Sequence, residues 1–166
     1  MEACMITIIN DPAELKYSPL MTLYAEDLCA QAQAEYADRS VNEGLMCAEQ
    51  DFYAYMTQVF LKTEGAYLAL WDNYEAALRI EPYQDGYLLT GLVTAPHCRR
   101  QGYATRLLNA VVQILPDHAQ LYSHVEKQNA ASIAFHEKFG FEKRFPYGKM
   151  LNGELLHNFW TFSYGK

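Results

Sequence analysis

Two neighbouring arginines precede a glycine in the segment Arg99-Arg100-Gln101-Gly102. Their guanidinium groups present forked donors that suit the oxygens of a phosphate group. Gly102 has no Cβ, so a ligand can approach the main chain closely at this position. If a helix begins directly after Gly102, its unpaired N–H groups and its dipole also favour an anion. The segment therefore has the chemistry of a phosphate cradle, or alternatively of an ordinary turn with two solvated arginines.

The residues on either side of this segment indicate a strand before it and a helix after it. Leu88 to Thr94 is apolar and rich in strand-forming residues, and Pro96 ends it. From Ala104 the apolar residues recur at helical spacing until Pro116 stops the helix. The turn lacks the Gly-Lys-Ser/Thr of a Walker motif and the GxGxxG of dinucleotide-binding proteins. We therefore expect an anion site of a different type between a buried strand and an amphipathic helix.

A second strand and helix follow, and the whole run resembles a known family. Leu121 to Val125 is a predicted strand, and Asn129 to Phe139 is a predicted helix. The turn sequence Arg-Arg-Gln-Gly-Tyr-Ala matches the acetyl-CoA signature of GCN5-related N-acetyltransferases. The helix, which begins with Asn and is followed by Gly-Phe, matches the later signature of that family at the right distance. The chain from about Leu88 to Glu142 therefore resembles this family, and the rest shows no sharp similarity.

The resemblance implies a single N-acetyltransferase domain over residues 1–166 with an α+β, α/β-like fold. In this fold a mixed, mostly antiparallel sheet of about seven strands is flanked by four helices, and two central parallel strands splay apart. The element order that we predict along the chain, β-α-α-β-β-β-α-β-α-β-β, agrees with that fold. Tyr87 to Val125 supplies the strand–helix–strand unit that makes the parallel pair.

The N-terminal part is predicted to contribute one strand and two helices. Met5 to Ile9 indicates the strand, and Asp11 is a predicted helix cap. Pro19 is expected to break that helix, so that it restarts with Ser18 as a new cap. Ser40 opens a capping box for the next helix. The residues that this helix is expected to bury are Leu45, Phe52, Tyr53, Met56, Val59 and Phe60.

The resemblance also implies how acetyl-CoA would be held as a co-substrate. The main chain at the end of the first strand would pair with the pantetheine arm like an added strand, and the amides of the turn would hold the pyrophosphate. Asn129 would cap its helix, bond to the cofactor, or do both. The residues implied in cofactor binding are Leu92, Val93, Thr94, Arg99, Arg100, Gln101, Gly102, Tyr103, Ala104, Thr105, Asn129, Ser132 and Phe135.

Two histidines, His124 and His136, are the predicted catalytic residues. Acetyl transfer to an amine requires loss of an amine proton, a stabilised oxyanion and a protonated leaving thiolate. The family often has a Tyr general acid at the position of His136. The histidine could donate the proton in place of that tyrosine, or it could only form a hydrogen bond to the sulfur or to Asn129. Some members have a Glu base at the position of His124, which could accept the amine proton directly or through water, or could be a core histidine. Glu81 is a further candidate base.

Charge and cysteine content exclude several other classes. The net charge of −7 argues against a nucleic-acid or anionic-membrane partner, which would require a basic face. The spacing of Cys4, Cys29, Cys47 and Cys98 fits neither a zinc site nor a small disulfide framework, so no metal is expected. No apolar run has membrane-spanning length and no export signal is recognisable, so we expect a cytoplasmic protein.

These observations predict an acetyl-CoA-dependent N-acetyltransferase that acts by direct transfer. A small-molecule primary amine is the expected acceptor, and a homodimer is a further expectation because dimers are common in this family. An acidic, aromatic-rimmed cleft between the first helices and the final strands would suit a cationic amine. The alternatives are a protein or peptide amine as acceptor, a CoA-binding module without turnover, and a nucleotide-phosphate binder.

Overall fold

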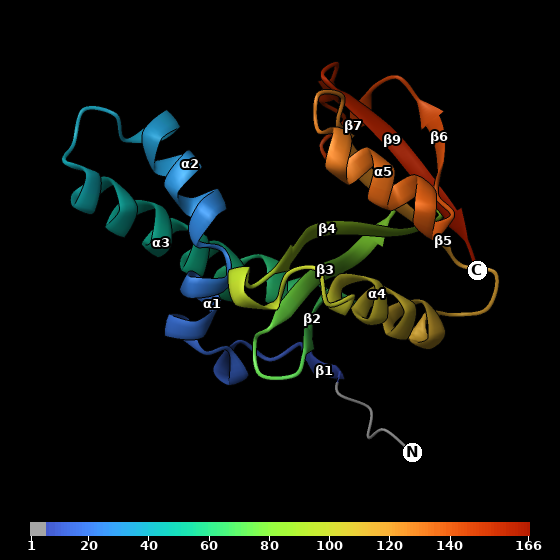
Figure 1. Cartoon of the computed structure of the whole chain (residues 1–166), viewed down its shortest axis with the longest axis horizontal. Coiled ribbons are helices and arrows are strands. Elements are labelled where there is room, and N and C mark those ends of the chain that lie inside the picture. The colour runs from blue at the N-terminus through green and yellow to red at the C-terminus, as the bar shows by residue number, and fades with distance from the viewer. Residues whose placement is uncertain (1–5) are drawn as a thin grey trace.

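The computed structural model describes residues 6–166, and its centre is a seven-stranded sheet with the strand order β1-β2-β3-β4-β5-β9-β6 (Figure 1). Cys4 and Met5 lie outside the described residues. The strands of this sheet are β1 (Ile6–Ile9), β2 (Tyr67–Trp71), β3 (Ala76–Tyr83), β4 (Gly86–Thr94), β5 (Gln120–Glu126), β6 (Glu142–Phe145) and β9 (Phe159–Gly165). A separate two-stranded hairpin is formed by β7 (Gly148–Lys149) and β8 (Leu155–Leu156).

Helices pack on both faces of the sheet and bury two core clusters. The α-helices are α1 (Tyr17–Leu23), α2 (Ala25–Glu35), α3 (Val41–Gln58), α4 (Tyr103–Ile114) and α5 (Ala130–Phe139). Three short 3-10 helices are η1 (Pro12–Glu14), η2 (Phe60–Lys62) and η3 (Pro96–Cys98). One core lies under α4 and includes Leu107, Leu108 and Phe162, whereas α1, α3 and η2 contribute Leu20, Met56 and Phe60 to the other. Helices α2 and α3 lie side by side and project from the body of the molecule (Figure 1).

The predicted α+β fold is confirmed, including the mixed sheet and its parallel pair β4–β5. The described residues contain five α-helices, not the four expected, because the first helical region is divided. The chain breaks at Tyr24 (φ −96°, ψ 16°), which ends α1 and precedes α2. None of these helices is long and apolar enough to cross a membrane.

Ser18 is not a helix cap, contrary to expectation. Helix α1 begins at Tyr17 with Lys16 as its cap residue, and Pro19 is its third residue. The N–H groups of a first helical turn have no partner within the helix, so a proline at this position removes no hydrogen bond. Pro19 therefore stays inside the helix that it was expected to break.

Ser40 caps α3 as predicted, since its Oγ accepts a hydrogen bond from the Glu43 N–H at 3.3 Å. Met56 and Phe60 are buried as predicted, but Val59 is 55% exposed. Helix α3 ends at Gln58, and the backbone of Val59 (φ −121°, ψ −66°) leaves the helical path before η2 begins. The helical spacing that would bury Val59 therefore stops one residue too early.

Strands β4 and β5 run parallel but pair only where they begin. The paired residues are Tyr87–Leu121, Leu88–Tyr122 and Leu89–Ser123. Beyond Leu89, β4 continues to Thr94 and β5 to Glu126 without pairing to each other. The pairing of β4 with β3 is also irregular here, between Ala77–Val93 and Arg79–Thr90. The two parallel strands are therefore splayed at their C-terminal ends, as the family resemblance implied.

The start of the parallel pair depends on a glycine. A Cβ on Gly86 would lie 2.1 Å from the carbonyl oxygen of Gln120, which is a backbone atom of the paired strand. We expect Gly86→Ala to lower the free energy of unfolding by about 3 kcal/mol, because the overlap forces the two backbones apart. Urea unfolding measures this. Gly165→Ala is the control, because no positive φ strains that position and a Cβ there meets only the end of the flexible Gln120 side chain, with Nε2 at 3.2 Å. Equal stability of Gly86→Ala and the unaltered protein would contradict the prediction.

Candidate functional site

A cavity of about 220 Å³ lies where β4 and β5 part. Both predicted catalytic histidines, His124 of β5 and His136 of α5, border it. The other lining residues are Leu89, Thr90, Gly91, Leu92, Ser123 and Ser132. The splayed strands and α5 therefore bring together residues that lie in three separate parts of the sequence.

The predicted anion cradle is an open turn at the N-terminus of α4. Gly102 is the cap residue of this helix and has a left-handed backbone with φ +79°, which glycine adopts without strain. A Cβ on Gly102 would meet nothing within 4 Å, so the turn is not filled by side chains. Arg100 also has a positive φ, of +63°, and its side chain is exposed. The turn is thus shaped to present main-chain N–H groups, and its residues fit a diphosphate.

The two arginines of the cradle differ in their surroundings. The Arg99 guanidinium forms an ion pair with Glu26 of α2, with Nη2 and Oε1 2.9 Å apart. No ion pair with Arg100 occurs within residues 6–166. Gln101 donates from its side chain to the His97 carbonyl oxygen at 3.2 Å. Arg100 and the helix N-terminus are therefore better placed than Arg99 or Gln101 to meet a phosphate group.

The remaining residues implied in cofactor binding lie near the cavity or behind it. Asn129 caps α5, because its Oδ1 accepts a hydrogen bond from the Ser132 N–H at 3.1 Å. Val93 packs against the core under α1 and α3, and Tyr103 stacks on Trp71 with ring centroids 6.3 Å apart. Phe135 stacks on Phe139 at 6.4 Å and does not line the cavity. Phe135 therefore packs within α5 and against the core, and not on the cavity wall.

His136 is buried, with 4% of its surface exposed, and both ring nitrogens have partners. Nδ1 lies 2.7 Å from the Ser132 carbonyl oxygen, which can only accept, so Nδ1 carries the proton. Nε2 lies 2.9 Å from Ser123 Oγ and accepts from that hydroxyl in the neutral ring. Burial lowers the pKa of His136, and the Ser132 carbonyl offsets this in part. A neutral His136 therefore has no proton on Nε2 to give to a leaving thiolate.

This burial makes the stability of the protein dependent on pH. The folded-state pKa of His136 lies below its ordinary value of 6.5, so the unfolded chain binds a proton that the folded chain binds only at lower pH. The stabilisation is complete above pH 6.5 and is lost as pH falls toward the lowered pKa. We expect His136→Phe to lose less stability than the unaltered protein on acidification from about pH 7.5 to about pH 5.5. Urea unfolding at both pH values measures this, and equal losses would contradict it.

His124 lies on the face of β5 opposite to that of Ser123, and it is half-buried. Its Nε2 is 3.5 Å from the Tyr83 hydroxyl, which donates its own proton to the Lys149 carbonyl oxygen at 2.5 Å. Burial lowers the pKa of His124, so the imidazole is neutral at pH 7. A neutral histidine at the edge of the cavity can accept a proton from a ligand.

The chain matches the family model described as "Acetyltransferase (GNAT) family" over residues 29–141. It belongs to the GNAT acetyltransferase family. N-alpha-acetyltransferase 50 of Danio rerio is 30% identical in an alignment of 110 residues that covers 64% of this chain and 60% of that protein. The match thus spans less than two thirds of the length of that relative.

Solved GNAT structures resemble the chain over nearly its whole length. The PaiA N-acetyltransferase of Thermoplasma acidophilum, in complex with coenzyme A, gives a TM-score of 0.59 at 15% identity, covering 97% of this chain and 99% of that chain. The ribosomal-protein-S18-alanine N-acetyltransferase of Escherichia coli gives 0.53 at 20% identity, covering 97% and 94%. At these identities the likeness shows that the chain has the GNAT fold.

A buried carboxylate lies on the same face of this GNAT sheet as His124. Glu81 alternates with Tyr83 along β3, so both side chains point toward the face on which Tyr83 meets His124. Glu81 is 9% exposed, and within residues 6–166 its carboxylate has no hydrogen-bond or ion-pair partner. Burial raises the pKa of Glu81, and the charge of Arg79 opposes that shift. The Glu81 carboxylate on this face is therefore free to accept hydrogen bonds from a ligand.

Sequence reasoning missed Ser123, which lines the cavity, and Arg79, whose Nε would lie 2.8 Å from a Cβ placed on the cavity-lining residue Gly91. Alternation along β5 places Ser123 on the opposite face from His124, but only the packing of α5 brings it to His136. The Arg79 guanidinium lies over three aromatic rings, Phe52, Tyr55 and Phe60, at 5.7, 5.9 and 5.7 Å from their centroids. A charged residue within an otherwise apolar strand, as in Leu78-Arg79-Ile80, is the signal that could have identified Arg79.

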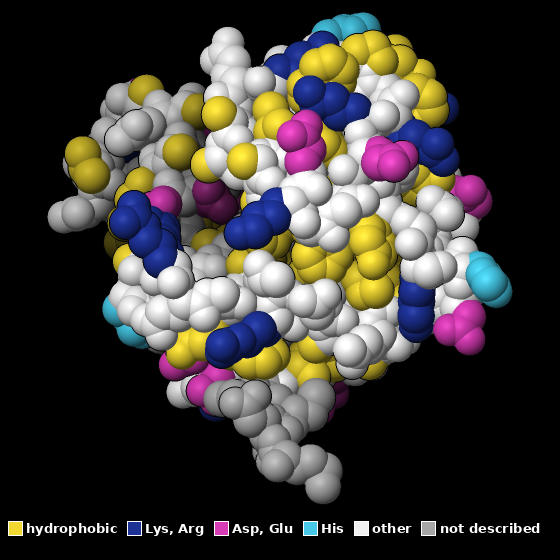
Figure 2. Space-filling model, turned by 45° about the vertical axis from the view of Figure 1, so that its right-hand side comes forward, with side chains coloured by type: hydrophobic (Ala, Val, Ile, Leu, Met, Phe, Trp, Pro, Cys, Tyr) yellow, Lys and Arg dark blue, Asp and Glu magenta, His cyan; other side chains and the backbone are white. Residues whose placement is uncertain are grey.

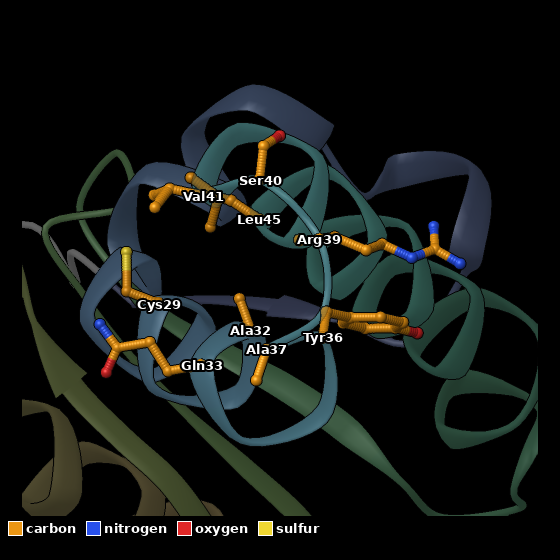
Figure 3. A pocket seen from close by; sticks show the side chains of 10 residues that line it. Cys29, Ala32, Gln33, Tyr36, Ala37, Arg39, Ser40, Val41 and Leu45 are labelled. Atoms are coloured by element: carbon orange, nitrogen blue, oxygen red, sulfur yellow. The ribbon is translucent and has the colours of Figure 1, made fainter.

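Two further surface features of the GNAT chain bear on its ligands. A second pocket, of about 290 Å³, lies between α2 and the start of α3, far along the chain from the cradle residues (Figure 3). Its lining is largely apolar and includes Ala32, Val41 and Leu45, but none of the predicted site residues.

On the face shown in Figure 2, Lys and Arg side chains are scattered among acidic and hydrophobic ones. This face therefore has no continuous basic patch of the kind that nucleic acids need.

Proposed function

We propose that this chain is an acetyl-CoA-dependent N-acetyltransferase that moves an acetyl group directly to a primary amine. The observation that carries the proposal is the cavity at the C-terminal ends of β4 and β5, which opens because their pairing stops at Leu89–Ser123. The open turn at Gly102 follows β4 and supports the same conclusion. Membership of the GNAT family makes acetyl-CoA the expected donor.

Acetyl-CoA, when bound, supplies an acetyl group activated as a thioester. Arg100 and the main-chain N–H groups from Gln101 to Thr105 would hold its pyrophosphate. The main chain of β4 from Leu92 to Thr94 would pair with the pantetheine arm, since it has no partner strand on the β5 side. Holding donor and acceptor together contributes to the rate by proximity, without any covalent bond to the protein.

His124 is the proposed general base of this reaction. Its imidazole is neutral at pH 7 because burial lowers its pKa, and it borders the cavity. It accepts a proton from the acceptor amine, directly or through a water molecule. We do not assign His136 the role of the acid in transfer to the amine, because its Nε2 accepts a hydrogen bond from the hydroxyl of Ser123.

The acceptor is proposed to be a small-molecule amine, with the α-amine of a protein or peptide as the second candidate. The second candidate is favoured by the names of two relatives, N-alpha-acetyltransferase 50 and the S18-alanine N-acetyltransferase. Both kinds of acceptor are cations at neutral pH, and both need a negative partner beside the cavity. Glu81, on the His124 face of the sheet, is the proposed partner.

Removing the charge of Glu81 tests this assignment. We expect Glu81→Gln to raise KM for the amine about tenfold, because a hydrogen bond to a charged group contributes roughly 1.5–3 kcal/mol. The affinity for CoA should not change. Steady-state kinetics with a varied amine, together with calorimetric titration of CoA, separate the two effects. Glu142→Gln, an exposed acid on β6, is the matched control. An unchanged KM in Glu81→Gln would remove Glu81 from the acceptor site.

The proposed function is tested by incubating the purified protein with acetyl-CoA and a panel of amines. The panel contains small primary amines, and peptides that differ in their first residue, each with an N-terminally blocked partner. We expect thiol release that depends on the amine, and a product heavier by one acetyl group. Binding of CoA without amine-dependent thiol release would support a CoA-binding module instead. Equal stabilisation against heat by ATP and CoA would support a nucleotide-phosphate binder.

A further inference from the structure

Ser123 and His136 form a hydrogen-bonded pair that faces the cavity between the splayed strands. The Ser123 Oγ lies 2.9 Å from His136 Nε2, and both residues line the cavity. His136 Nδ1 donates to the Ser132 carbonyl oxygen at 2.7 Å. A hydroxyl, a base within hydrogen-bond reach and a third group that orients the base make up the arrangement of an activated nucleophile.

The Ser132 carbonyl oxygen determines which atom donates in each of these two hydrogen bonds. Because the Ser132 oxygen can only accept, it holds the His136 proton on Nδ1 and leaves a lone pair on Nε2. Ser123 must then donate to Nε2, which increases the negative charge on its oxygen. Both side chains are 4% exposed, so bulk water does not compete strongly for this hydrogen bond. The pair is therefore ready to transfer a proton from Ser123 to His136.

Main-chain groups of β4 lie next to this hydroxyl. Gly91 and Leu92 line the same cavity as Ser123, and they follow the point where the β4–β5 pairing ends. Main-chain groups of β4 that point toward β5 thus have no partner strand there. N–H groups in such a position can stabilise the negative oxygen that forms when a carbonyl is attacked.

We propose that Ser123 accepts the acetyl group of acetyl-CoA when no amine is present, and that water then releases it, which makes the protein an acetyl-CoA hydrolase as well. The inference rests on the proposed function, because it needs the thioester in this cavity. The Ser123 oxygen forms a bond to the acetyl carbon, and His136 takes the serine proton. The carbon–sulfur bond breaks, and His136 returns that proton to the thiolate. Water then attacks the acetyl ester, giving acetate and regenerating the Ser123 hydroxyl. An amine that reaches the thioester first bypasses Ser123.

The experiment compares two acetyl donors in the absence of amine: acetyl-CoA, and p-nitrophenyl acetate, which does not need a CoA site. After acid quenching, peptide mass spectrometry locates any acetyl group. We expect both donors to acetylate Ser123. We expect thiol release from acetyl-CoA to be about a hundredfold slower in Ser123→Ala and in His136→Phe. Ser163→Ala is the matched control, because Ser163 is a buried serine of the same sheet that does not line the cavity.

The possible results separate this inference from the proposed function. Acetylation of Ser123 by the ester but not by acetyl-CoA would support the nucleophile and count against the acetyl-CoA site. Heat stabilisation by CoA with no acetyl group on Ser123 from either donor would overturn the nucleophile and leave the proposed function standing. Equal thiol release by Ser123→Ala and the unaltered protein would also overturn it.

Discussion

Gly102→Val is expected to weaken CoA binding at least about a hundredfold, which corresponds to about 2.8 kcal/mol. The turn at Gly102 is open, since a Cβ there meets no protein atom within 4 Å. A branched side chain would therefore occupy the space above the N–H groups of α4 in which the proposal places the pyrophosphate. Calorimetric titration with CoA measures the change directly.

Backbone strain must be separated from this effect. Gly102 has φ +79°, and a residue with a Cβ in this region costs roughly 1–2 kcal/mol of stability. Gly153→Val is the matched control, because Gly153 also has a positive φ, of +90°, and open space, but lies in the turn between β7 and β8. Both variants should unfold at similarly reduced urea concentrations, and only Gly102→Val should lose CoA affinity. A folded Gly102→Val protein with unchanged CoA affinity would refute the cradle.

His124→Ala is expected to lower kcat about a hundredfold to a thousandfold, while the Kd for CoA stays close to that of the unaltered protein. General base catalysis by a positioned histidine contributes in this range, and His124 lies on the cavity wall rather than at the cradle. His157→Ala, an exposed histidine in the turn before β9, is the matched control and should keep full activity. Equal kcat values in His124→Ala and the unaltered protein would remove His124 from the mechanism.

The pH profile gives a second readout for His124. Only the neutral imidazole can accept a proton, and burial lowers its pKa from the ordinary value of 6.5. The rate should therefore be independent of this group above pH 6.5 and should fall as pH drops through the lowered pKa. In His124→Ala this acid limb should disappear from the profile of kcat/KM. An unchanged acid limb in the variant would assign it to another group, for which Glu81 is the first candidate.

The role of His136 shows how tertiary packing changes the meaning of a residue type. A histidine in place of the family's tyrosine could donate a proton if its Nε2 carried one. Packing of α5 on β5 instead places Nε2 against Ser123 and Nδ1 against a carbonyl oxygen. The Nε2 atom of His136 therefore accepts a hydrogen bond on the side of the cavity and does not donate one. Neither contact can be read from sequence spacing, because Ser123 and His136 lie on different elements.

The parts of this protein that the sequence determined by itself depend on residues that are close in the chain. The glycine turn before α4, the Asn129 cap of α5 and the Ser40 cap of α3 each follow from a glycine or a short polar side chain at a helix start. The order of strands and helices follows from periodicity for the same reason. These features formed where they were expected because few residues decide them.

The tertiary structure decided which groups are charged, buried or already bonded. It paired Arg99 with Glu26, exposed Val59, and joined Ser123 to His136 in the cavity. A pKa, an ion pair or a tautomer depends on the dielectric and on partners brought in from distant segments, and sequence periodicity carries no information on either. Sequence patterns therefore located the proposed acetyl-CoA site, whereas only the packing of α5 against the splayed strands determined what its histidines can do.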